Sequence, residues 1–177
     1  MTIVQPANAE ETRALLRWAV EEAEENVAVR LAIGPSPRRI ELPLDYRVAP
    51  GRGTVLRKGL DVALFAYGPV MLHEALTAAE RLSGDGVDAC VVDMPWLNRV
   101  DPPWLAELVA GIGAIFVIED HAPAGALGDA LRRELNGRAV TVFGVEGWPA
   151  FGTPSETLRL HGLDGASLAE RIRTSAL

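Results

Sequence analysis

The stretch that decides the fold runs from Asp61 to Gly84 and reads DVALFAYGPVMLHEALTAAERLSG. Its first part, through Ala66, is almost entirely apolar after the aspartate, which predicts a parallel strand covered on both faces. Its second part carries apolar residues at helical spacing, and Pro69 suits the first turn of a helix. We therefore expect Gly68 and Pro69 to form the turn between a buried strand and an amphipathic helix.

The same alternation recurs along the rest of the chain. Further strands are expected at 53–57, 87–93, 114–118 and 139–143, and further helices around 105–109, 126–135 and 166–174. Strands that alternate with helices of this length are typical of a sheet built from right-handed crossover units. The sequence therefore predicts an α/β fold of three layers, with a mostly parallel sheet and helices on both of its faces.

The N-terminal residues predict a strand–helix–strand fragment. Two apolar runs, 2–5 and 27–33, are expected to be strands, and a helical stripe between them extends through Glu24. Asn8 is placed to cap this helix, with Glu11 three residues later at the capping-box position.

Four prolines and little periodicity mark residues 34–50 as a linker. The expected organisation is therefore a fragment at 1–33, too small to stand alone, then the linker, and then the main domain at 51–177.

Composition excludes several classes of protein. The hydrophobic content of 49% predicts a folded chain, and the net charge of −7 without a basic run argues against nucleic-acid and membrane-surface partners. No apolar segment approaches the roughly 20 residues that span a bilayer. Because the N-terminus lacks a signal-peptide pattern, we expect a cytoplasmic protein. The single cysteine, Cys90, lies in an apolar run and is expected to be a buried, inert thiol.

The most plausible functional loop runs from Glu119 to Gly128. It follows the apolar strand at 114–118, and ligands of open α/β sheets bind outside the carboxyl ends of strands. Glu119, His121, Gly125 and Gly128 are the candidate residues. The structural alternative, which we favour over catalysis, is that Glu119 and His121 cap helices or contact a partner subunit.

No metal site or catalytic residue is predicted for this chain. Asp120 and His121 are adjacent and expected to point apart, and the other histidines, His73 and His161, have no ligand-like spacing to them. No serine lies in a G-x-S-x-G motif, and neither G-x-G-x-x-G nor a P-loop pattern is present.

The order of these segments resembles one enzyme family. Residues 55–101 (VLRKGLDVALFAYGPVMLHEALTAAERLSGDGVDACVVDMPWLNRVD) resemble the start of the C-terminal domain of transketolase-like enzymes, a group that includes transketolases, deoxyxylulose-phosphate synthases and the beta subunits of 2-oxo acid dehydrogenases. The resemblance continues through FVIEDHAPAGALGDAL and FGVEGWPAFGTPSETLRLHGLD. The departure is Ala126, where the family usually has a second glycine. Residues 1–33 resemble the last strand–helix–strand of the preceding pyrimidine-binding domain.

This resemblance implies that other domains bind the cofactor. In the family, thiamine diphosphate and a divalent metal lie between a diphosphate-binding domain, which carries a G-D-G motif, and the pyrimidine-binding domain. The one G-D-G of this chain, at residues 84–86, lies at the end of the helix of the opening stretch, in the part that resembles the C-terminal domain and not a diphosphate-binding domain. The glutamate that activates the aminopyrimidine ring lies earlier in the family than the part matched here. We therefore expect no cofactor site on this chain alone.

The resemblance also bears on the substrate. In transketolases and deoxyxylulose-phosphate synthases an arginine after the strand matching 27–31 binds substrate phosphate, and Ile33 occupies that position here. An apolar side chain cannot make charge-assisted hydrogen bonds, so we expect a substrate without phosphate at this point. Arg30, Arg38 and Arg39 are the substrate-binding candidates.

The function expected from the resemblance is that of a C-terminal component of a two-carbon transferase, with scaffold, dimerisation and active-site-rim roles. The component is either one subunit of a split enzyme or a fragment of a longer chain, and a start within a domain favours the fragment. Its partners would be the other cofactor-binding domains, in a homodimeric assembly. The alternative is a module like the 2-oxo acid dehydrogenase beta subunit, which docks a carrier or acyltransferase partner.

Overall fold

The computed structural model describes residues 1–176 as seven strands and six helices. The strands are β1 (Thr2–Val4), β2 (Val27–Val29), β3 (Thr54–Arg57), β4 (Val62–Ala66), β5 (Ala89–Asp93), β6 (Ala114–Ile118) and β7 (Val140–Phe143). The helices are α1 (Ala9–Glu21), α2 (Gly68–Gly84), α3 (Pro102–Val109), α4 (Leu127–Glu134), α5 (Pro154–Leu160) and α6 (Gly165–Ala176).

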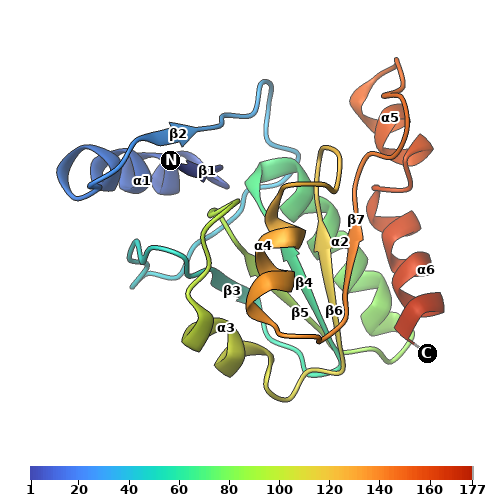
Figure 1. The fold of residues 1–177 in the computed structure, drawn as a ribbon. Coiled ribbons are helices and arrows are strands. Elements are labelled where there is room, and N and C mark those ends of the chain that lie inside the picture. The colour runs from blue at the N-terminus through green and yellow to red at the C-terminus, as the bar shows by residue number, and fades with distance from the viewer. Residues whose placement is uncertain (177) are drawn as a thin grey trace.

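The main domain is built on a five-stranded sheet with the order β3-β5-β4-β6-β7 (Figure 1). β4 lies at its centre and pairs in parallel with both β5 and β6, and β7 continues the parallel pairing. Only β3, at one edge, is antiparallel. The predicted α/β fold with a mostly parallel sheet is therefore confirmed.

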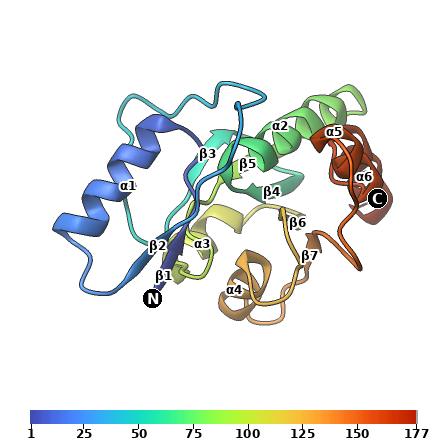
Figure 2. The same cartoon turned by 90° about the horizontal axis from the view of Figure 1, so that it is seen from above.

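Helices cover both faces of this sheet, as Figure 2 shows from above, with α2 and α6 on one side and α3 and α4 on the other. The alternating side chains of β4 explain the two cores: Val62, Leu64 and Ala66 face α2 and α6, whereas Ala63 and Phe65 face the opposite layer. All five residues of β4 are buried, so the strand needs apolar side chains on both of its faces.

The N-terminal segment, residues 1–33, forms a separate small sheet. β1 and β2 pair in parallel, and α1 connects them (Figures 1 and 2). α1 is anchored to the main domain where Trp18 meets Trp96 edge to face, with ring centroids 4.9 Å apart. The following residues, 34–50, contain no helix or strand.

Several boundaries differ from the sequence predictions for identifiable reasons. The strand expected at 27–33 ends at Val29. Its partner strand, β1, is followed by Pro6, which has no N–H to donate to the next residue of β2, so the pairing cannot continue. The first helix ends at Glu21 and not at Glu24. Its last turn contains no basic residue that would interact favourably with the negative end of the helix dipole, so the acidic residues that follow do not extend it. Helix α5 was not predicted at all, because it buries no residue and so lacks an apolar stripe.

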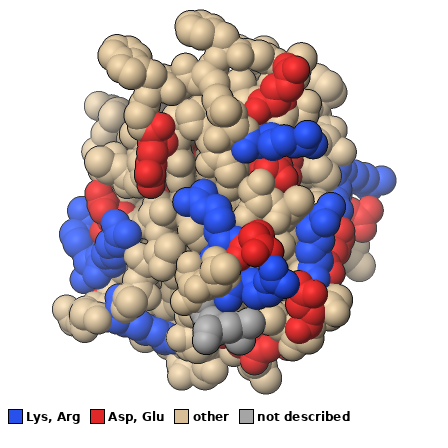
Figure 3. All heavy atoms as spheres, turned by 90° about the vertical axis from the view of Figure 1, so that its right-hand side faces the viewer, with Lys and Arg blue, Asp and Glu red and all other residues tan. Residues whose placement is uncertain are grey.

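Within the described residues, no helix is both long enough and apolar enough to cross a membrane. Charged side chains of both signs are interspersed on the face shown in Figure 3, which carries no large basic patch.

Candidate functional site

The N-terminal segment packs against residues that follow the carboxyl ends of β4 and β5. The backbone N–H of Gln5 donates to the carbonyl of Pro95 at 2.9 Å, and Leu97 donates to Ile3 at the same distance. Gly68 lies directly beneath Gln5: its φ is +66°, and a Cβ there would lie 2.4 Å from the Gln5 Nε2 atom. Glycine is therefore required in the turn after β4, because it accepts the backbone conformation and leaves room for Gln5.

Glu119 caps helix α4 from the end of β6. Its side chain is fully buried, and Oε1 accepts a hydrogen bond from the backbone N–H of Gly128 at 2.9 Å. The residue at the N-cap, Ala126, offers no side-chain acceptor. The carboxyl of Glu119 therefore takes the place of a local cap at the positive end of this helix. Burial raises the pKa of Glu119, against the opposing effects of the Gly128 N–H and His121.

Gly128 is fitted closely to this carboxyl. A Cβ at this position would lie 2.4 Å from Cγ2 of Val142 and 3.0 Å from Oε1 of Glu119. In the same turn, the N–H of Gly125, whose φ is +79°, donates to the carboxylate of Asp129 at 2.6 Å. The two glycines thus allow the 119–128 loop to close onto the first turn of α4.

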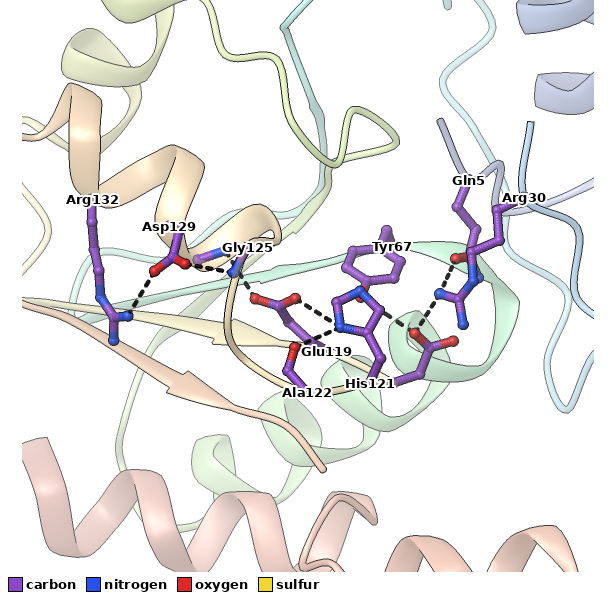
Figure 4. A network of polar contacts seen from close by, with 11 residues as sticks. Gln5, Arg30, Tyr67, Glu119, His121, Ala122, Gly125, Asp129 and Arg132 are labelled. Atoms are coloured by element: carbon purple, nitrogen blue, oxygen red, sulfur yellow. Dashed lines mark hydrogen bonds and ion pairs between the residues drawn. The ribbon is translucent and has the colours of Figure 1, made fainter. Parts of the chain in front are cut away.

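His121 connects Glu119 to Tyr67, the residue after β4 (Figure 4). Its Nδ1 lies 2.8 Å from the carbonyl of Ala122 and 3.6 Å from Oε2 of Glu119, and its Nε2 lies 3.1 Å from the Tyr67 hydroxyl. The Tyr67 hydroxyl also lies 3.3 Å from Oδ1 of Asp120. The expectation that Asp120 and His121 point apart is wrong, since both side chains reach the same hydroxyl.

Tyr67 acts in this network as a neutral hydroxyl. Burial raises its pKa, and the nearby carboxylates of Asp120 and Glu119 raise the pKa further. Its single hydroxyl hydrogen serves either the imidazole of His121 or the carboxylate of Asp120. A tautomer of His121 that donates from Nδ1 to the carbonyl of Ala122 leaves Nε2 to accept this hydrogen.

Arg30 links the network to the N-terminal segment (Figure 4). Its Nη1 donates to Oδ1 of Asp120 at 2.5 Å and to Oε1 of Gln5 at 2.6 Å. Arg30 directly follows β2, Gln5 directly follows β1, and Asp120 follows β6. Polar side chains after three strands of two sheets therefore meet at one place.

The other two candidate arginines lie outside this network. Arg38 forms a two-pronged ion pair with Glu80 on α2, with distances of 2.7 and 3.2 Å. The guanidinium of Arg39 lies 3.5 Å from Glu41 and is largely exposed. The structure thus joins Arg30, Glu119, His121 and the two glycines, and separates them from Arg38 and Arg39.

Sequence reasoning missed two members of the network, Gln5 and Tyr67, and included Asp120 in the 119–128 loop without naming it as a candidate. Their position in the sequence could have identified them, because each of these residues lies within two residues of the end of a strand. Tyr67 in particular is a polar-tipped aromatic at the end of an otherwise apolar strand, a place where its hydroxyl needs a partner.

The residues present do not fit thiamine diphosphate or its metal. The N-terminus of α4, where backbone N–H groups would receive a phosphate, is already capped by the carboxyl of Glu119. Asp120 adds a second carboxylate, close enough to raise the pKa of Glu119. Among residues 1–176, no group of three or more metal-binding side chains is arranged to hold an ion. The hydrogen bonds of these residues join the 119–128 loop to the first turn of α4 and to the N-terminal segment.

The chain belongs to the family described as transketolase, C-terminal domain, whose model matches residues 51–168. Among curated relatives, it is 33% identical to 1-deoxy-D-xylulose-5-phosphate synthase of Chlorobium luteolum and 34% identical to that of Acidovorax ebreus. These matches cover 98% and 97% of this chain, but only 28% and 27% of the relatives. The chain therefore spans less than a third of their length.

Solved structures agree with this assignment. A chain described as "Split gene transketolase, inactive beta4 tetramer" is 35% identical, with a TM-score of 0.88, and the match covers 98% of this chain and 57% of that one. A transketolase from Campylobacter jejuni shares the fold at 20% identity, with a TM-score of 0.74 over 98% of this chain and 26% of that chain. The predicted family resemblance is thus confirmed.

Proposed function

We propose that this chain is a C-terminal component of a thiamine diphosphate-dependent enzyme of the transketolase type. Its roles are scaffold, dimer contact and active-site rim, and the cofactor and its metal bind to other domains. The observation that carries this proposal is the small sheet of β1 and β2. This sheet is too small to be a domain by itself, yet Arg30 and Gln5 connect it to Asp120 of the main domain.

Two parallel strands alone do not form a stable sheet in water. Parallel sheets are normally covered on both faces, and three or more strands are usually needed for independent stability. Within the described residues, β1 pairs with β2, and no other strand pairs with β2. Apolar side chains nearby are also open to solvent: Val20 on α1 is 85% exposed and Ile33 after β2 is 103% exposed. These features support a role as one part of a larger pyrimidine-binding domain.

The similar split-gene chain supports the same role. It is described as an inactive tetramer of beta chains, which is consistent with a component that associates and has no activity alone. We infer that this chain likewise requires a polypeptide that supplies the diphosphate-binding domain, with its G-D-G motif, and the glutamate that activates the cofactor.

Reconstitution tests this role. The purified chain is mixed with a polypeptide from the same genome that carries a diphosphate-binding domain with its G-D-G motif. Ketol transfer is then followed with thiamine diphosphate and Mg²⁺ present. We expect activity only in the mixture. Full activity of either polypeptide alone would refute the proposal.

The substrate proposal rests on Ile33. Its exposed apolar side chain offers no charge-assisted hydrogen bond to a phosphate, and Arg38, which is engaged by Glu80, is not free to replace it. We propose a substrate without phosphate at this point. In the reconstituted enzyme, kcat/KM should be higher for unphosphorylated than for phosphorylated donors, and I33R should shift this preference toward the phosphorylated ones. Equal rates in both forms would contradict this proposal.

A second candidate role is a docking module like the 2-oxo acid dehydrogenase beta subunit. The observation that favours it is the group of exposed apolar side chains around α5, in which Trp148 is 95%, Phe151 103% and Leu160 72% exposed. Titration with an acyltransferase core should then change the fluorescence of Trp148 in the wild type and not in F151A. An unchanged signal in the wild type would remove this candidate.

A further inference from the structure

Two fully buried carboxyl groups, one from helix α1 and one from strand β5, interact with each other. Glu11 lies in the first turn of α1, and Asp93 is the last residue of β5. Both residues have a relative exposure of 0%, and each carboxyl is close enough to alter the pKa of the other. The contact therefore belongs to the junction between the N-terminal segment and the main domain, and it is separate from the Glu119 network.

The hydrogen bonds at this contact all go to Glu11. Its Oε2 accepts from the backbone N–H of Ala7 at 2.7 Å, and its Oε1 accepts from the hydroxyl of Tyr46 at 2.8 Å. Neither carboxyl oxygen of Asp93 has a hydrogen-bond partner in the described residues, when carboxyl hydrogens are not counted. No basic side chain of residues 1–176 forms an ion pair with either group.

Two buried negative charges in contact, without a cation, are strongly unfavourable. Burying one unpaired carboxylate already has a large free-energy penalty, and a second like charge beside it adds repulsion. One proton shared by the two carboxyls leaves a single negative charge, which removes the repulsion and halves the buried charge. A protonated Asp93 would donate a hydrogen bond to Glu11 and so satisfy an otherwise orphaned group, as happens when two carboxyls share a site.

We propose that Glu11 and Asp93 share one proton, and that this proton is taken up when the N-terminal segment docks on the main domain. The docking of residues 1–33 is thereby linked to pH. This inference does not depend on the proposed function, because it concerns only the junction within this chain.

The environment of the pair favours this proton. Burial raises the pKa of Asp93 well above its ordinary value, and the adjacent Glu11 raises it further. Burial also raises the pKa of Glu11, against the lowering effects of the hydrogen bonds from Ala7, Tyr46 and Asp93. Among the described residues, Tyr46, from residues 34–50, is the other titratable group in contact with the pair. Burial, together with Glu11 and the nearby carboxyls of Asp93 and Glu10, raises the pKa of Tyr46, so it remains a hydrogen-bond donor.

The sign of the pH dependence follows from proton counting. In the unfolded chain both carboxyls ionise with pKa values near 4, whereas the folded pair retains a proton at higher pH. The folded state therefore binds more protons above about pH 4, and its stability falls as the pH rises. For one proton, the folding equilibrium constant falls about tenfold for each pH unit between the unfolded pKa and the raised pKa of the pair.

The test compares three variants of the full chain. In D93N and in E11Q, an amide N–H replaces the shared proton, and the remaining carboxyl can ionise without repulsion. E10Q changes an exposed carboxyl on the same helix and is the matched control. Urea unfolding is measured from about pH 5 to pH 8, and the slope of stability against pH is compared with the wild type.

In the wild type and in E10Q, we expect the folding equilibrium constant to fall about tenfold for each pH unit. In D93N and E11Q, most of this pH dependence should be lost. If either variant fails to fold, carboxyl ¹³C NMR of the wild type decides, since one buried carboxyl should remain protonated at pH values where the exposed carboxyls have already ionised. Equal slopes in all four proteins, or a wild type in which the two buried carboxyls ionise together with the exposed ones, would overturn the proposal.

Discussion

Truncation of Glu119 to alanine is the sharpest perturbation of the loop after β6. E119A removes the acceptor of the buried Gly128 N–H, and an unsatisfied buried donor costs about 1–3 kcal/mol. It also removes a carboxyl from the N-terminus of α4, where a negative charge contributes about 0.3–2 kcal/mol. Because burial raises the pKa of Glu119 and so reduces its charge, we take the lower part of this second range. The expected loss of unfolding free energy is about 1–4 kcal/mol.

Two further variants separate capping from charge. E119Q keeps an oxygen that accepts from Gly128 and should lose less than half as much stability as E119A. E134A alters a glutamate at the opposite end of α4, where a negative charge opposes the dipole, and should be neutral or slightly stabilising. Urea unfolding at neutral pH gives the three values. A loss below about 0.5 kcal/mol in E119A, or equal losses in E119A and E119Q, would refute the capping role.

Three other predictions concern the same region. G128A should destabilise the chain by about 0.5–2 kcal/mol, because overpacking against Val142 outweighs the roughly 1 kcal/mol gain in helix propensity. In a double-mutant cycle measured by urea unfolding, V142A should recover part of this loss. R30M removes the ion pair with Asp120 and should increase hydrogen exchange in β1 and β2, whereas unchanged exchange would mean that the pair does not hold the segment. Y67F should lose about 1 kcal/mol of thermal stability, and a neutral result would show that the hydroxyl is dispensable.

The regular part of the fold was predictable because its signals are local. The stretch from Asp61 to Gly84 combines an all-apolar strand with a helix whose first turn tolerates proline, and both elements are present as β4 and α2. Gly68 was predicted as a turn. Its further role, close contact with Gln5, depends on residues 63 positions apart in the sequence and has no local signal.

Helix α5 shows a signal that was present but overlooked. The sequence Thr153-Pro154-Ser155-Glu156 is a capping box with proline in the first turn, and both reciprocal hydrogen bonds form. The search for helices relied on apolar periodicity, and this helix buries no side chain. Capping chemistry and periodicity are thus independent signals, and an exposed helix shows only the first.

The candidate loop was placed correctly after β6, but its chemistry depended on tertiary contacts. The capping alternative for Glu119 agrees with its hydrogen bond to Gly128, whereas the partners of His121 come from a different strand end. Likewise, Asp93 looked like the end of a strand, and nothing in the sequence indicated that helix α1 would place Glu11 against it. Contacts between distant polar residues are decided by packing, which a single sequence does not display.

The proposed role is tested most directly by calorimetry with thiamine diphosphate and Mg²⁺. The chain alone should show no binding, because the N-terminus of α4 is already capped by Glu119 and no metal-binding cluster is present among residues 1–176. The mixture with the polypeptide that carries the diphosphate-binding domain should bind the cofactor. Micromolar binding by this chain alone would contradict the assignment of the cofactor site to other domains.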